Sequence, residues 1–85
     1  MANGTTPSHL ALTFNISDLV QAETLGQAVN ELEAAKAHLV EVAMASLQGL
    51  QIRDAQGKFF SPKLALDMMN RRVNNAERTV RFFSK

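Results

Sequence analysis

Side chains that could do chemistry are few in this sequence. His38 and Glu41 stand three residues apart, a spacing that places both on one face of a helix and could begin a metal site. Cysteine is absent, so thiolate ligands and nucleophiles are excluded. Ser46 follows His38 by eight residues, too far along the same helix for a hydrogen-bonded nucleophile and base. We therefore expect no enzyme, no bound metal and no cofactor.

A basic stretch suggests a second kind of chemistry. Residues 70–81 read NRRVNNAERTVR, and such arginines could contact nucleic-acid phosphates while the asparagines contact base edges. The arginines are Arg71, Arg72, Arg78 and Arg81. The formal net charge of the whole chain is only +1, an ordinary balance and not that of a dedicated nucleic-acid binder. A small nucleic-acid-binding regulator is therefore an alternative function and not the preferred one.

Two long segments must position these side chains, and both carry a helical pattern. In residues 17–48, leucines and alanines recur at spacings of three and four, and Asn15 or Ser17 could cap the N-terminus. Residues 61–84 repeat the spacing, and Ser61 followed by Pro62 is typical of a helix start. The first segment is acidic and the second basic, which favours their pairing. We predict one small, mainly α domain over residues 1–85, an antiparallel, coiled-coil-like two-helix hairpin.

The connector, residues 49–60, is longer than a helical hairpin requires and carries apolar side chains that a solvated loop would not. Asp54 and Gly57 favour a turn, so the connector is either a short β-hairpin or an irregular loop. Phe59 and Phe60 are adjacent, so in an extended segment one would anchor the hairpin while the other faces out. We expect this region to contact a partner protein through Leu50, Ile52, Arg53, Lys58, Phe59, Phe60 and Met68.

The N-terminal region differs in character from the rest. Residues 1–9 are small and polar and are expected to be flexible. Residues 10–16 alternate apolar and other side chains, which predicts an extended arm. Both helical segments also carry more apolar side chains than a two-helix hairpin can bury. We expect a second copy to cover this surplus in a homodimer, and otherwise the arm to cover it.

These patterns favour a non-enzymatic protein–protein interaction module. Such a small adaptor, assembly factor or inhibitor would dock on its partner through apolar helix faces and the connector. No apolar run reaches the roughly 18 residues needed to span a bilayer, and no basic residue precedes the first apolar patch. The expected location is therefore the cytoplasm, away from membranes.

A short resemblance supports a different alternative. Residues 74–83, NNAERTVRFF, resemble part of the second helix of needle subunits of bacterial type III secretion. The layout of an N-terminal segment and two helices is also similar to that of needle subunits and their co-chaperones. The connector here is longer than in needle subunits, and no residue role is carried across. The resemblance implies a structural subunit or co-chaperone of a secretion or virus-like assembly.

Overall fold

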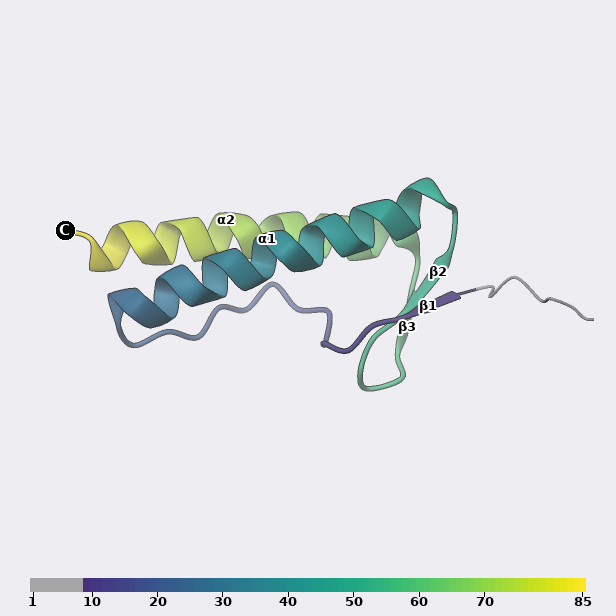
Figure 1. Ribbon diagram of the computed structural model, residues 1–85, viewed down its shortest axis with the longest axis horizontal. Coiled ribbons are helices and arrows are strands. Elements are labelled where there is room, and N and C mark those ends of the chain that lie inside the picture. The colour runs from purple at the N-terminus through teal and green to yellow at the C-terminus, as the bar shows by residue number, and fades with distance from the viewer. Residues whose placement is uncertain (1–8) are drawn as a thin grey trace, which may run out of the picture.

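The structure of the protein is a computed structural model that describes residues 9–85. Two helices lie side by side and run in opposite directions, and three short strands form a sheet at one end of the pair (Figure 1). In chain order the elements are β1 (His9–Ala11), α1 (Leu25–Leu47), β2 (Gln51–Arg53), β3 (Phe59–Phe60) and α2 (Pro62–Phe83). The segment predicted to be flexible lies outside the described residues except for His9, which begins β1.

The predicted mainly helical hairpin is confirmed, because α1 and α2 pack against each other along their length. Each helix has one buried side, and small residues dominate the buried side of α1 and that of α2. These buried residues are Ala28, Ala35, Val42, Ala45, Ala65, Met69 and Ala76. Alanine adds little bulk between two helices, so their axes can approach closely.

The start of α1 was predicted wrongly. The helix begins at Leu25 instead of residue 17, and the Oγ1 atom of Thr24 caps it by accepting a hydrogen bond from the backbone N–H of Gln27 at 3.2 Å. Residues 12–24 form no helix and run back along the helical pair. From here on, the arm means residues 12–24, because β1 takes up the start of the 10–16 range expected from the sequence. Ile16 is buried in the core, and the carbonyl of Asp18 accepts a hydrogen bond from the Asn75 side chain at 2.8 Å. These contacts with distant residues outweigh the local capping signals.

The start of α2 agrees with the sequence pattern. Ser61 is the N-cap, and its Oγ accepts a hydrogen bond from the backbone N–H of Leu64 at 3.2 Å. Pro62 is the first helical residue, where its missing N–H leaves no hydrogen bond unmade. Both signals act within one turn of the chain, so no distant contact is needed to define this boundary.

The connector forms a β-hairpin, not an irregular loop. β2 is the central strand of the sheet, pairing antiparallel with β3 and parallel with β1. The register aligns Leu10 with Ile52 and Ile52 with Phe60, so these three side chains share one face. That face closes the core where the sheet meets the helices, together with residues such as Leu12, Ile16, Val42 and Met69. Pairing of β1 with the connector was not predicted.

Among residues 9–85, neither helix combines the length and apolar character needed to cross a membrane.

Candidate protein-docking surface

The turn between β2 and β3 is built around one buried carboxylate. Asp54 is only 4% exposed, and its Oδ1 accepts hydrogen bonds from the backbone N–H groups of Gln56 and Lys58, both at 3.0 Å. Its Oδ2 accepts a longer bond from the backbone N–H of Ile16 at 3.4 Å. Gly57 has a φ of 84°, a conformation that glycine adopts without strain. Asp54 therefore fixes the turn and also fastens the arm to it.

Two backbone hydrogen bonds extend this attachment. The N–H of Leu12 donates to the carbonyl of Arg53 at 2.7 Å, and the N–H of Ala55 donates to the carbonyl of Phe14 at 3.0 Å. The start of the arm is thus held along the β-hairpin. The sheet therefore presents its outer side, the one facing away from the core, as a supported surface.

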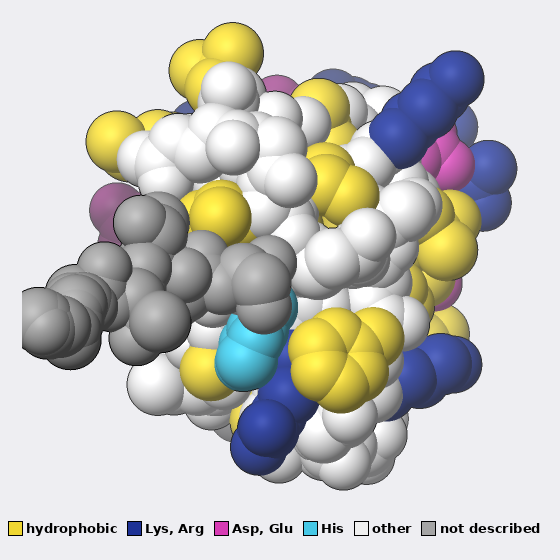
Figure 2. Space-filling view, turned by 90° about the vertical axis from the view of Figure 1, so that its right-hand side faces the viewer, with side chains coloured by type: hydrophobic (Ala, Val, Ile, Leu, Met, Phe, Trp, Pro, Cys, Tyr) yellow, Lys and Arg dark blue, Asp and Glu magenta, His cyan; other side chains and the backbone are white. Residues whose placement is uncertain are grey.

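An exposed aromatic ring dominates this outer side. Phe59 is 57% exposed, whereas its neighbour Phe60 is only 8% exposed and belongs to the core. The ring of His9 meets the ring of Phe59 edge to face, with centroids 5.6 Å apart. Figure 2 looks directly onto this end of the molecule and shows a histidine beside a hydrophobic side chain, with basic side chains nearby.

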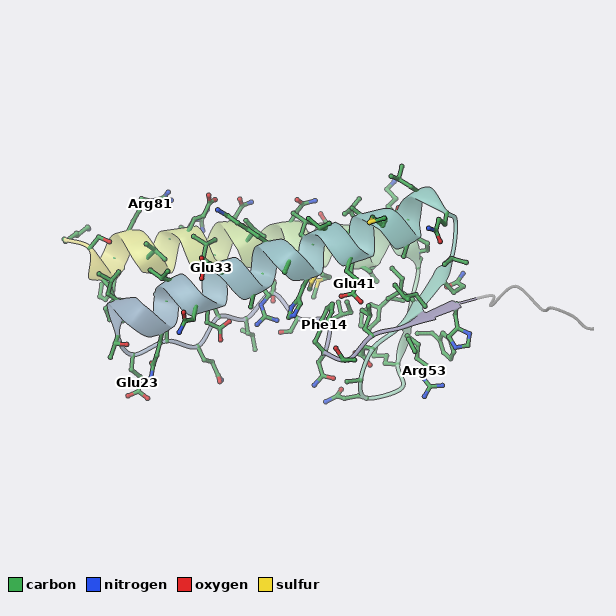
Figure 3. All side chains as sticks on the ribbon, in the orientation of Figure 1. Phe14, Glu23, Glu33, Glu41, Arg53 and Arg81 are labelled. Atoms are coloured by element: carbon green, nitrogen blue, oxygen red, sulfur yellow. The ribbon has the colours of Figure 1, made fainter. Side chains whose placement is uncertain are left out.

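One cation borders the aromatic pair of His9 and Phe59. Arg53 pairs with Phe59 across the strands, is exposed, and extends away from the helices (Figure 3). Lys58 is also exposed, but its Nζ lies 5.3 Å from the centroid of the Phe60 ring, so its ammonium group lies on the face of the sheet opposite Phe59, contrary to the expectation that it contributes to the same surface. We call the set of His9, Arg53 and Phe59 the sheet surface. An apolar centre with a polar rim is the common anatomy of a protein interface.

The other predicted contact residues are less accessible. Ile52 is fully buried, and Phe60 is nearly so, because both point from the sheet into the core. Leu50 and Met68 are half-buried and pack against the same core. All four side chains belong to the core or pack against it, and Phe60 is the anchoring member of the phenylalanine pair. His9 is part of the sheet surface but was not among the predicted residues.

The four arginines proposed for nucleic-acid binding differ in their exposure and in their ion pairs. Arg72 turns inward and donates to Glu31 at 3.0 Å, and both side chains are largely covered. Arg71 pairs with Asp67 one turn away at 3.2 Å on an exposed surface. Arg78 and Arg81 are exposed. The alternative of nucleic-acid binding therefore loses one of its four arginines to an internal ion pair.

His38, the candidate metal ligand, contacts the arm. Its ring stacks on Phe14 with centroids 3.6 Å apart and planes inclined by 6°. Burial lowers the pKa of His38, and the nearby Arg72 lowers it further, against the opposing effects of Glu41 and Glu31. Within residues 9–85, no three histidine, aspartate or glutamate side chains come together as a metal site would require.

Sequence reasoning missed the roles of two residues. Asp54 was identified as a turn residue, but its burial was not foreseen. The motif DAQG did carry a signal, since aspartate three residues before glycine is typical of a turn in which the carboxylate accepts backbone N–H groups. The stacking of His38 on Phe14 had no such signal, because the two lie far apart in sequence.

No family model, no curated protein and no solved structure matches this chain. A function for it must therefore be inferred from the geometry of its own residues.

Proposed function

We propose that this chain is a non-enzymatic protein–protein interaction module that docks on a partner protein through the sheet surface. The observation that carries the proposal is the exposure of Phe59 on a strand whose other side is anchored by Phe60. A large ring held in place before binding loses little conformational entropy when a partner covers it. Aromatic side chains and arginines are also the residues that most often dominate the energy of protein interfaces.

The rim supports the same proposal. Arg53 is exposed beside the aromatic pair of His9 and Phe59, so the sheet surface is basic at its margin. A partner with acidic side chains around an apolar recess would complement it. An adaptor, an assembly factor and an inhibitor would all use such a surface, and none of these roles requires a catalytic group.

Exchange of each phenylalanine for alanine tests the proposal. Phe59→Ala should weaken the capture of partner proteins from an extract of the native cells at least about tenfold, while the melting temperature stays close to that of wild type. Phe60→Ala should instead destabilise the fold by about 3–5 kcal/mol, because it removes a buried ring.

Phe82 provides the matched control, since it is 67% exposed and lies near the end of α2 remote from the sheet. Phe82→Ala should leave capture unchanged. Equal capture by wild type and Phe59→Ala would refute the proposal. Loss of capture with Phe82→Ala alone would move the docking surface to the opposite end of the hairpin.

A further inference from the structure

One side of α2 is basic along most of the helix. On the side turned away from its buried residues, every third or fourth position carries a charged or amide side chain, and all of these side chains are exposed. We call this row the α2 stripe; it consists of Lys63, Asp67, Arg71, Asn74, Arg78 and Arg81. Spacings of three and four residues keep the row on one face of the helix. The α2 stripe is therefore a continuous polar row with four cations and one carboxylate.

The cations of the α2 stripe are spread out in a line. Lys63 and Arg81 stand near the two ends of α2, and the helical rise of about 1.5 Å per residue separates them by about 27 Å. Arg71 and Arg78 lie between them, about 10 Å apart along the axis. A compact anion needs cations that converge on one point, whereas cations in a straight row match a long ligand with charges at regular intervals.

Most of these cations are free to bind an anion. Within the described part of the chain, Lys63, Arg78 and Arg81 form no ion pair. Arg71 pairs with Asp67 at 3.2 Å, but both side chains are more than half exposed, and such exposed pairs are weak. A phosphate group can therefore compete with Asp67 for Arg71.

The small net charge of the chain hides a separation of charge. The exposed acidic side chains Glu23, Glu33 and Glu41 lie on α1 or just before it. Figure 3 shows Arg81 on the upper edge of the molecule, on α2, and Glu23 and Glu41 below α1 on the side of the arm. An extended anion is attracted to the α2 side and repelled from the other, so the field of the protein orients it toward the α2 stripe.

We propose that the α2 stripe binds the phosphate backbone of a double-stranded nucleic acid. Arginine matches phosphate well, because its planar guanidinium group donates two parallel hydrogen bonds to phosphate oxygens. A duplex is also a straight and evenly charged polyanion, as the linear row of cations requires. Contacts of this kind carry no sequence information, so the binding is independent of sequence.

Other anionic partners fit the α2 stripe less well. It has no apolar centre, which protein interfaces usually have, and no aromatic ring on which an unpaired base could stack. The apolar side of α2 is turned toward α1 and the core, so it cannot enter a lipid surface. The proposal is independent of the docking function, because the sheet surface lies at one end of the hairpin and the α2 stripe runs along it (Figure 1).

Fluorescence anisotropy with labelled DNA and RNA duplexes, titrated at several salt concentrations, provides the test. With three or four phosphate contacts, the logarithm of the association constant should fall with the logarithm of salt concentration with a slope of about −3 to −4 on DNA. Two DNA duplexes of unrelated sequence should bind equally. Binding of either kind of duplex with this salt dependence supports the proposal, and the tighter of the two is the natural class of ligand.

Single substitutions locate the contacts. Arg78→Gln and Lys63→Gln should each weaken binding roughly five- to tenfold at about 0.1 M salt and make the salt slope shallower by about 1. Lys36→Gln is the matched control, because it removes the same charge from an exposed position on α1, and it should change neither quantity. Asp67→Asn should instead tighten binding, because it frees Arg71 and removes the carboxylate from the α2 stripe. Circular dichroism should show all four variants folded, since all four positions are exposed.

Three results would overturn the proposal. The first is no binding of either duplex at about 50 mM salt and about 100 μM protein, where even weak electrostatic binding is detectable. The second is equal weakening by Lys36→Gln and Lys63→Gln, which would show a response to net charge alone. The third is equal or tighter binding to vesicles containing phosphatidylserine or to polyglutamate, which would assign the α2 stripe to a membrane or to an acidic protein.

Discussion

At the scale of single residues, the protonation state of His38 affects how firmly the arm is held. Its ring is covered by Phe14 from the arm, while Arg72 from α2 and Glu31 and Glu41 from α1 surround it. Folding lowers the pKa of His38 below its ordinary value of about 6.5. At a pH just below 6.5, His38 therefore binds a proton more readily in the unfolded chain than in the folded one. The contribution of the neutral His38 ring to the free energy of unfolding is complete at neutral pH and falls as the solution becomes weakly acidic.

We therefore expect the melting temperature to fall as the pH drops from about 7 to about 5.5, before most carboxylates titrate. His38→Phe should remove part of this fall, because phenylalanine can stack on Phe14 without binding a proton. Thermal melts of both proteins across this range provide the measurement. Identical pH profiles for wild type and variant would show that His38 does not contribute.

Asp54 shows what a local motif can and cannot predict. The turn was expected from DAQG, but the hydrogen bond to Ile16 joins residues far apart in the chain, which no local pattern encodes. Asp54→Ala should destabilise the protein by about 1–3 kcal/mol, because it leaves backbone donors without their acceptor. Urea denaturation measures this loss, and the exposed Gln56→Ala serves as control. Equal stability of Asp54→Ala and wild type would contradict the structural role of the carboxylate.

At the scale of elements, the two helix starts differ in how far they were predictable. The start of α2 follows from Ser61 and Pro62, which act locally. The start of α1 was predicted eight residues early, because nothing local shows that Asn75 and the core hold residues 16–18 outside the helix. The outward phenylalanine of the connector was expected from alternation, whereas the partner strand β1 was not.

The capping difference can be measured directly. Thr24→Ala should destabilise the protein by about 0.5–2 kcal/mol and increase amide exchange at the first turn of α1, because the N–H of Gln27 loses its acceptor. Ser17→Ala removes one of the two caps that the sequence suggested and should leave amide exchange in the first turn of α1 unchanged. A larger effect from Ser17 than from Thr24 would place the helix start where the sequence pattern suggested.

The close approach of the helices gives another prediction at this scale. Ala35 is fully buried between them, whereas Ala37 is exposed on the same helix. Ala35→Leu should destabilise the fold by about 1–3 kcal/mol through overpacking, and Ala37→Leu should change stability little. Thermal or urea unfolding of both variants tests the packing. A tolerant Ala35 would mean that the helices leave room between them for a larger side chain.

At the scale of the whole molecule, the arm, the hairpin and the sheet share one core. Ile16 is 8% exposed and packs with residues from both helices and the connector, whereas Leu19 in the same arm is 70% exposed. Ile16→Ala should therefore cost on the order of 2–5 kcal/mol and lower protection from hydrogen exchange throughout the chain. Leu19→Ala should change neither quantity. If protection from hydrogen exchange were lost only near residue 16, the arm would be shown to unfold by itself.

The shortness of the strands has a bearing on solubility. A sheet with two open edges offers unpaired backbone groups that can recruit strands from other molecules and begin aggregation. Here the edge strands β1 and β3 span three and two residues, and Lys58 places a charge directly beside the shorter one. Such edges are too brief to act as templates for fibrils. The chain can therefore display Phe59 on a sheet while avoiding the hazard that usually accompanies an exposed, apolar β-surface.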